Sequence, residues 1–404
     1  MTSHKLWLGS LVVLLGGAFT LSGLAADRSA VDRKTDVAVI YFPGYHRDAH
    51  YDAWFGEGWN EWTLLAEAPI RFPGQRLFKP EWGPFDEADP KWMERQVALA
   101  ADHGVSVFVI DWYWYSGVKF IHRPLEEGFL KAGNRDRLKF ALMWANHNWG
   151  NYFPVPIDRE MHRLLTIRHS PGDFQRVMDD CIQMYFRQPN YWRVDGGLYF
   201  SIFDPWGFME QLGGPEKTRE VLNAARKQIE SAGLGKIHFA AFTGGADGIP
   251  KLHAAGFDST TCYNVTASGK ARLPERPLDE YTDLMDRSVA FWKEMDTGVL
   301  PHMPTVTVGW DTTPRWVKDA PWPPPDRGYP YTPIVVNNTP ERFGELVAKA
   351  LEQVSTARLR PPAILINAWN EWTEGSVLLP DVTYKTQYLG ELKKAVDKAA
   401  TQHD

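Results

Sequence analysis

Two glutamates near the end of the chain, Glu371 and Glu374, have a spacing that suits acid–base chemistry. They follow the apolar run 364–366, and a helical turn there would place both side chains on one face. Two neighbouring carboxyl groups favour one shared proton, which separates an acid from a base. Glycosidic bond cleavage needs this pair, because one group protonates the leaving oxygen and the other activates a nucleophile. The alternative is that one glutamate caps a helix and the other is solvated.

The chain repeats a short pattern that includes one of these glutamates. W-N-E-W-T occurs at 59–63 and again at 369–373, so that Glu61 corresponds to Glu371. The first copy could lie in a loop that lines the site, or it could simply begin a helix. No other internal repeat is evident.

The elements that must position these side chains are apolar runs alternating with amphipathic stretches. Near-continuous apolar strands between helices indicate a parallel sheet, and eight such units favour a single (β/α)₈ TIM barrel of the α/β class. The helix signal is clearest at 339–354, where Thr339 can cap and Pro340 suits the first turn. Further helices are predicted at 90–103, 215–232 and 385–400. The strands are predicted at 37–45, 105–115, 139–147, 198–205, 237–245, 259–264, 304–311 and 363–372.

Two long loops are expected in this barrel, after strands 1 and 7. They comprise residues 46–90 and the Pro-rich stretch 314–333. No linker rich in Pro, Gly or Ser divides the chain, which favours one catalytic domain over residues 27–404. Functional groups of such barrels lie at the carboxyl ends of the strands, so these loops should border the site.

Polar and aromatic residues gather at those predicted strand ends. Asp111 and Asp311 could bind sugar hydroxyls, or each could pair with a basic residue, as Asp311 could with Arg315. Aromatic rings could stack on a sugar, although strand alternation turns about half of them away from the barrel interior. The predicted substrate-binding residues are Tyr41, His46, Glu61, Trp62, Asp111, Tyr113, Trp114, Trp144, Asn146, His147, Asp311, Arg315, Trp369, Asn370 and Trp372.

Composition narrows the range of ligands. The chain has 404 residues, with 44 Lys and Arg against 50 Asp and Glu, and a net charge of −6. Without a basic run, this balance argues against nucleic acid or an anionic membrane as partner. There are 18 Trp, 15 Tyr and 21 Phe, an excess that fits either large core fillers or a surface for stacking on sugars. Tryptophans fall at or just past predicted strand ends at 112, 114, 144, 149, 206, 310, 369 and 372.

The amino terminus has the layout of a secretory signal peptide. One Lys precedes an apolar stretch from Leu6 to Leu24, and small residues follow at Ala25 and Ala26. We expect cleavage after 25 or 26, which makes 1–26 the signal peptide and the mature protein secreted or periplasmic, without stable membrane insertion. An uncleaved membrane anchor is the alternative.

The two cysteines, Cys181 and Cys262, are expected to be buried free thiols, although a disulfide is the alternative. Two Cys cannot form the usual structural zinc site, and no H-E-x-x-H occurs. We expect no cofactor and no metal, and a monomer.

The ordered blocks described above resemble the WbsX-type glycosyltransferase/hydrolase domain and the related glycoside hydrolase family 99, the endo-α-mannosidases. The matching blocks are 41–46, 58–63, 111–115, 144–149, 310–315 and 367–375. The resemblance implies a (β/α)₈ barrel that hydrolyses α-linked sugars with retention and without metal. It also implies that Glu371 deprotonates the sugar 2-hydroxyl to give a 1,2-anhydro intermediate, and that Glu374 is the acid and then the base. His147 stands where the WbsX-like pattern has Glu, a departure that bears on the identity of the substrate.

Three functions therefore compete. The first is a secreted glycoside hydrolase acting on a glycan or polysaccharide. The second is a glycosyltransferase of polysaccharide biosynthesis, against which stand the signal peptide and the lack of an Asp-x-Asp motif or glycine-rich dinucleotide loop. The third is a non-catalytic carbohydrate-binding barrel, which would keep the aromatic residues and lose the glutamate pair.

Overall fold

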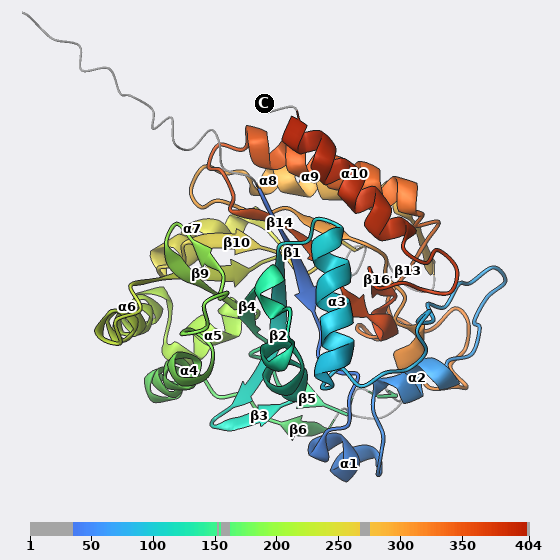
Figure 1. Ribbon diagram of the computed structural model, residues 1–404, viewed down its shortest axis with the longest axis horizontal. Helices are drawn as coiled ribbons and strands as arrows, with labels where there is room; N and C mark the ends of the chain where they lie inside the picture. The colour runs from blue at the N-terminus through green and yellow to red at the C-terminus, as the bar shows by residue number, and fades with distance from the viewer. Residues whose placement is uncertain (1–34, 152, 155–161, 267–274, 402–404) are drawn as a thin grey trace, which may run out of the picture. The chain divides into compact units, whose positions relative to one another are not determined.

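Eight parallel strands form a closed barrel in the computed structural model, which describes residues 35–151, 153–154, 162–266 and 275–401 (Figure 1). Hydrogen-bonded neighbours run in the order β10-β9-β8-β4-β2-β1-β14-β12. A parallel bridge from Thr260 to His302 joins β10 to the segment before β12 and completes the ring. The strands are β1 (Asp36–Tyr41), β2 (Val107–Tyr115), β4 (Lys139–Trp144), β8 (Gly197–Ile202), β9 (Lys236–Phe242), β10 (Ser259–Thr261), β12 (Thr305–Thr307) and β14 (Ala363–Asn367). The predicted (β/α)₈ barrel is confirmed.

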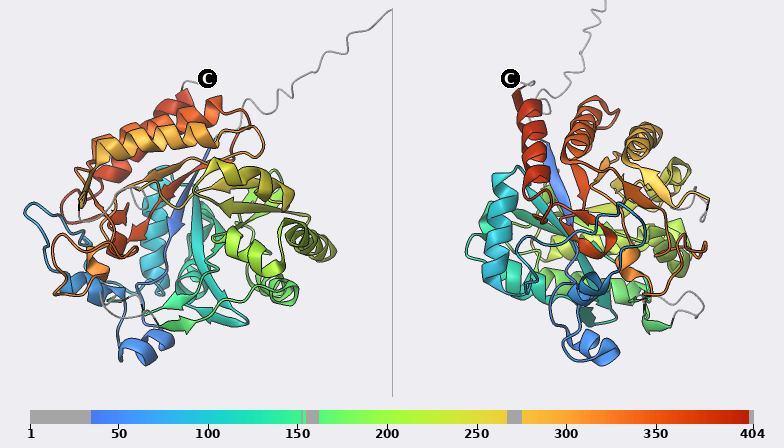
Figure 2. Two further views of the ribbon diagram at one scale, coloured as in Figure 1. Left: turned by 180° about the vertical axis from the view of Figure 1, so that it is seen from behind. Right: turned by 90° about the vertical axis from the view of Figure 1, so that its right-hand side faces the viewer.

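Helices cover the outside of this barrel (Figures 1 and 2). The side chains of Asp89, Ser170 and Thr339 cap three of them and accept hydrogen bonds from free backbone N–H groups. Proline stands in the first turn of each of these helices, where its fixed φ suits the helix. α9 packs against both α8 and α10. The helices are α1 (Ala49–Phe55), α2 (Glu61–Glu67), α3 (Pro90–Asp102), α4 (Pro171–Met184), α5 (Pro205–Leu212), α6 (Pro215–Ser231), α7 (Ile249–Ala254), α8 (Tyr281–Met295), α9 (Pro340–Thr356) and α10 (Gln387–Thr401).

Except for β2, which ends at Tyr115 as predicted, the predicted strands continue too far at their carboxyl ends. The run predicted at 363–372 leaves the barrel at Asn367, and the chain then forms a small hairpin of β15 (Asn370–Glu371) and β16 (Ser376–Val377) around the 3₁₀ turn η7 (Trp372–Glu374). Residues past the last barrel hydrogen bond are just as buried and aromatic as those before it, so apolar pattern does not mark the boundary. The remaining short strands are β3 (Val118–Phe120), β5 (Trp149–Gly150), β6 (Arg163–Leu165), β7 (Arg193–Val194), β11 (Leu278–Glu280) and β13 (Ile334–Val336).

The two long loops lie where they were predicted, after β1 and after β12, and they pack on each other. Phe72 of the first loop belongs to a small apolar cluster with Trp316 and Tyr331 of the second. The guanidinium of Arg71 donates to the backbone oxygens of residues 317, 318 and 320. These contacts fix the second loop at the carboxyl end of the barrel, where a site would lie.

Other predictions fall on specific parts of the chain. Cys181 and Cys262 are buried and free, as expected. The predicted signal peptide, 1–26, lies outside the described residues. Within the described residues, every helix is too short or too polar to cross a membrane.

Candidate active site

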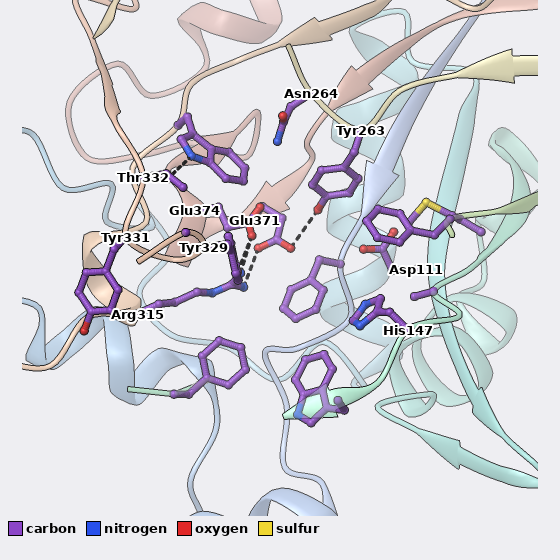
Figure 3. A pocket seen from close by; sticks show the side chains of 18 of the residues that line it. Asp111, His147, Tyr263, Asn264, Arg315, Tyr329, Tyr331, Thr332, Glu371 and Glu374 are labelled. Carbon is purple, nitrogen blue, oxygen red and sulfur yellow. Dashed lines mark hydrogen bonds and ion pairs between the residues drawn. The ribbon is translucent and has the colours of Figure 1, made fainter. Parts of the chain in front are cut away.

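A cavity of about 580 Å³ lies at the carboxyl ends of the barrel strands, where Glu371, Glu374 and Asp111 point into the same space (Figure 3). Its size and its largely aromatic lining, with a few polar groups, are typical of a small-molecule site. It is lined by Phe42, Asp111, Tyr113, Met143, Ala145, His147, Trp149, Phe153, Phe203, Tyr263, Asn264, Trp310, Arg315, Asp326, Gly328, Tyr329, Tyr331, Thr332, Pro333, Glu371 and Glu374.

The side-chain amide of Asn370 binds the backbone that carries the glutamate pair to the segment after β1. The Oδ1 atom of Asn370 accepts from the backbone N–H of Phe42 at 2.8 Å, while its Nδ2 donates to the Phe42 carbonyl at 2.6 Å. The same Nδ2 donates to Glu87 at 2.6 Å. Burial raises the pKa of Glu87 to about 8. Asn370, predicted to bind substrate, thus holds the hairpin to β1 and does not line the cavity.

The turn that carries Glu374 depends on Gly375. This glycine has a φ of +64°, in the left-handed region, and a Cβ atom built on it would lie 2.7 Å from the backbone N of Asp311. The close approach permits the Asp311 N–H to donate to the Glu374 carbonyl at 2.6 Å. The glycine therefore fixes η7 against the segment after β12.

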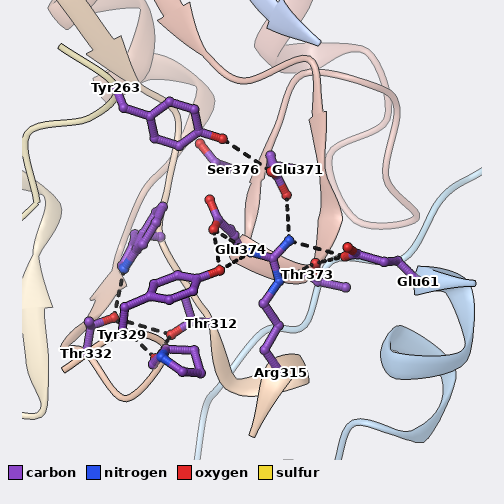
Figure 4. A network of polar contacts seen from close by, with 12 residues as sticks. Glu61, Tyr263, Thr312, Arg315, Tyr329, Thr332, Glu371, Thr373, Glu374 and Ser376 are labelled. Atoms are coloured by element: carbon purple, nitrogen blue, oxygen red, sulfur yellow. Dashed lines mark hydrogen bonds and ion pairs between the residues drawn. The ribbon is translucent and has the colours of Figure 1, made fainter. Parts of the chain in front are cut away.

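Arg315 binds both glutamates of the pair at once (Figure 4). Its Nη1 donates to Glu374, its Nη2 donates to Glu371 at 3.2 Å, and the same Nη2 donates to Glu61 at 3.2 Å. Its Nε donates to the Thr373 hydroxyl at 3.0 Å. The side chains of Arg315 and of its three glutamate partners are buried, and that of Arg315 is 4% exposed. The alternative that Asp311 pairs with Arg315 is not realised: Asp311 accepts from Gln75 and Thr313, because the loop after β12 turns between the two residues.

Two phenols complete the surroundings of the pair. Tyr263 Oη donates to Glu371 at 3.2 Å, and Tyr329 Oη donates to Glu374 at 2.8 Å. Tyr263 follows β10 and Tyr329 comes from the second long loop. Each glutamate thus has one phenol and one guanidinium nitrogen as donors.

Burial decides the protonation of the carboxyl groups in the cavity. It raises the pKa of Glu371 well above the usual value, the charge of Glu374 raises it further, and Arg315 opposes both effects. Burial also raises the pKa of Glu374, against the lowering effects of Arg315 and Tyr329. Because the two groups interact strongly, the proton belongs to the pair and not to either residue. This is the electrostatic condition for one acid and one base.

Asp111 and His147 supply further polar atoms to the cavity. The Oδ1 atom of Asp111 is buried and has no hydrogen-bond partner in the described part of the chain. Burial, and then the charge of Glu374, raise the pKa of Asp111 well above its usual value. His147 Nδ1 lies 2.9 Å from the Asn148 carbonyl, to which it must donate, so Nε2 of the neutral ring is an acceptor. Burial lowers the pKa of His147, which favours this neutral ring.

Strand alternation separates the predicted site residues into two groups. On β2, Asp111 and Tyr113 face the cavity, whereas Trp114 faces outward and donates to Asp180 of α4 at 2.6 Å. Trp144 and Trp369 also face outward, toward Phe174 and toward Gln96 respectively. Trp114 and Trp144 do not line the cavity, because neighbouring residues of a strand point to opposite faces. Trp369 lies between β14 and β15 and is also absent from the cavity wall.

The other predicted residues surround the site without lining the cavity. Glu61 lies behind Arg315, and Trp62 and Trp372 pack on each other with ring centroids 5.8 Å apart. Asn146 donates to the Asp204 carbonyl at 2.9 Å. Tyr41 packs on Phe108, and His46 is buried 4.0 Å from Asp48. Of the predicted substrate-binding residues, those on the cavity wall are Asp111, Tyr113, His147 and Arg315.

Several lining residues were not among the predicted site residues. Tyr263 and Asn264 follow β10 as the predicted residues follow their strands, so the strand-end rule could have found them. Tyr329 and Tyr331 stand in a loop, where no periodicity indicates direction. The further aromatic residues on the wall are Phe42, Trp149, Phe153, Phe203 and Trp310.

Within the residues that the structure describes, no three His, Cys, Asp or Glu side chains are arranged to hold a metal ion.

The fold is a (β/α)₈ barrel, and two interacting carboxyl groups face the cavity at the carboxyl ends of its strands. The chain belongs to the glycosyltransferase WbsX family, whose model matches residues 37–392. Two relatives named WxcX, from strains of Xanthomonas campestris pv. campestris, are 26% and 25% identical over 90% of this chain. The chain spans about half of the length of these relatives, 50% in each case.

Solved structures of glycoside hydrolases share the fold. The family 99 endo-α-mannosidase from Bacteroides thetaiotaomicron has a TM-score of 0.57 at 16% identity, over 91% of this chain and 98% of the mannosidase chain. A structure described as a glycoside hydrolase-like protein has a TM-score of 0.60 at 15% identity, over 96% and 97% of the two chains. At these identities the similarity concerns the fold.

Proposed function

We propose that the protein is a retaining glycoside hydrolase that cleaves α-linked sugars in a glycan or polysaccharide. The observation that carries the proposal is that Glu371 and Glu374 face one aromatic-lined cavity while both bind one buried guanidinium. The fold similarity to a family 99 endo-α-mannosidase supports the choice of α-linkages. The apolar amino-terminal segment supports export to the periplasm or exterior.

In the proposed reaction, the sugar 2-hydroxyl is the nucleophile. Glu371 takes the proton of that hydroxyl. The 2-oxygen of the sugar then attacks the anomeric carbon to form a 1,2-anhydro sugar as the glycosidic bond breaks. Glu374 donates its proton to the leaving oxygen. In the second half, Glu374 removes a proton from water, which opens the three-membered ring at the anomeric carbon, and Glu371 returns its proton to the 2-oxygen. Two inversions give net retention.

The remaining cavity residues have binding roles in this proposal. The Asp111 Oδ1 atom, which has no partner among the described residues, and the His147 Nε2 acceptor are suited to sugar hydroxyls. Tyr113, Trp149 and Phe153 offer ring faces and edges for the apolar side of a sugar. Tyr263 and Tyr329 orient the two glutamates through their hydroxyl groups.

Transfer of a glycosyl group is the second candidate, favoured by the description of the family as glycosyltransferases. The two reactions differ in the donor they require. We expect the purified protein to release reducing sugar from at least one member of a panel of α-linked oligosaccharides in buffer alone, as measured by chromatography. Turnover that appears only after a nucleotide-sugar is added would establish transfer. Binding to the panel without turnover under either condition would establish a carbohydrate-binding barrel.

A further inference from the structure

The two W-N-E-W-T segments of the chain meet at one guanidinium. Asn60 caps α2 by accepting from the Trp62 N–H at 3.0 Å, so the first copy begins a helix, and Glu61 is the first residue of that helix. Trp62 of the first copy packs on Trp372 of the second. Figure 4 shows Glu61 and Glu374 on opposite sides of the Arg315 guanidinium. The repeat in the sequence is therefore a pair of segments in contact.

Glu61 and Glu371 share one nitrogen atom. Nη2 of Arg315 lies 3.2 Å from Oε2 of each glutamate. The Thr373 hydroxyl donates to the same Oε2 of Glu61 and accepts from Nε of Arg315. Glu61 is 0% exposed and does not line the cavity, so it cannot touch a substrate held there.

We propose that Glu61 is a positioning residue that divides the positive charge of Arg315 between itself and the glutamate pair. The proposal rests on the proposed function, because it assigns Glu61 the task of keeping one proton on Glu371 and Glu374. A guanidinium bound to the pair alone would stabilise both carboxylates and remove the acid. A third carboxylate on the same guanidinium takes part of that charge, and so leaves one proton on the pair at higher pH.

Among the described residues, charged and titratable groups face this arrangement from several parts of the chain. Glu61 faces Arg315, the two glutamates of the pair and the phenols of Tyr45 and Tyr51. Burial, then the charge of Glu61, raise the pKa of both phenols well above 10, so they stay neutral. Glu371 additionally faces Asp111, Tyr113, Tyr263 and Tyr329 from the cavity wall.

The direction of the effect follows from these charges. After burial, the charge of Glu61 is among the causes that raise the pKa of Glu371 and of Glu374, while Arg315 lowers both. Removing the Glu61 charge should lower the pKa of the pair in two ways. The repulsion from Glu61 is lost, and the positive charge of Arg315 then interacts with the pair alone. For two unit charges about 6 Å apart at an effective dielectric constant of about 20, the direct effect corresponds to roughly two pH units.

The test compares Glu61→Gln, Glu61→Asp and the wild type by titration and by rate. In protein labelled with ¹³C at glutamate carboxyls, and with Glu371 assigned through Glu371→Gln, the Glu371 resonance should titrate about two pH units lower in Glu61→Gln. Glu61→Asp keeps the charge and should stay within about half a unit of the wild type. Both limbs of the pH profile of kcat/KM should move in parallel with the titration, with KM changed less than twofold.

Controls separate charge from structure. Glu67, at the other end of α2, forms an exposed pair with Lys318, so Glu67→Gln should leave the titration and the profile unchanged. An unshifted Glu371 titration in folded Glu61→Gln, with activity lowered equally at every pH, would overturn the proposal. If the wild type hydrolyses no glycan and Glu371 still titrates lower in Glu61→Gln, the division of charge stands and the proposed hydrolysis fails.

Discussion

Glu374→Gln should lower kcat/KM on a natural glycan by about 10³-fold, because glutamine cannot give a proton to the leaving oxygen. Glu371→Gln should lower it by a similar factor, because the 2-hydroxyl then lacks its base. Both variants keep the shape of the side chain and an acceptor for Arg315, so binding of the glycan by calorimetry should change only a few fold. Glu127, whose side chain is 41% exposed and paired with Arg123, provides the matched control, and Glu127→Gln should retain full activity.

The leaving group distinguishes the roles of the two glutamates. An aryl glycoside with an acidic phenol needs little protonation as it departs, so Glu374→Gln should recover most of the lost rate in the first step on such a substrate. Glu371→Gln should not recover, since the need for a base on the 2-hydroxyl is unchanged. Unchanged hydrolysis of the natural glycan in both variants would remove the site assignment, and recovery in Glu371→Gln alone would exchange the roles.

Arg315→Met should lower the free energy of unfolding by about 3–5 kcal/mol near pH 7, the usual effect of leaving buried charges without their partner. Arg315 binds Glu61, Glu371 and Glu374, all of them buried. In the variant, the pKa of each of Glu371 and Glu374 rises further above that of the unfolded chain. The variant therefore loses stability as pH rises above the unfolded value of about 4.5, and the difference from the wild type should shrink toward pH 5.

Urea unfolding at pH 7 and pH 5 measures this difference. Arg47 is the control, because its ion pairs with Asp52 and Glu57 are at the surface and its side chain is 56% exposed. Arg47→Met should change stability by less than about 1 kcal/mol at either pH. A loss of similar size for Arg315→Met at both pH values would mean that packing, and not charge, explains the role of Arg315.

The sequence predicted the barrel and the glutamate pair because both are local signals. Apolar runs alternate with capped helices, and N-E-W-T-E-G follows the last run directly. The direction in which each strand-end side chain points was not predictable. Tyr113 lines the cavity, whereas its neighbour Trp114 contacts α4. Which of two neighbouring residues points into the barrel depends on how β2 is oriented in the sheet.

Long-range contacts account for the other differences. Sequence proximity made Asp311 one possible partner of Arg315, yet the partners Glu61 and Glu371 are 254 and 56 residues away. Tyr329 reaches Glu374 from a loop whose path depends on packing against Phe72 and Arg71 of another loop. Neither contact has a period or a motif that a single sequence would reveal.

The most direct test of the central claim is the configuration of the first product. A glycan that the wild type cleaves should be followed by ¹H NMR from the first minutes, before mutarotation equilibrates the anomers. The proposed double displacement at the anomeric carbon predicts that the α-anomer of the released sugar appears first and that the β-anomer grows in later. Initial formation of the β-anomer would contradict 2-hydroxyl participation by the Glu371 and Glu374 pair.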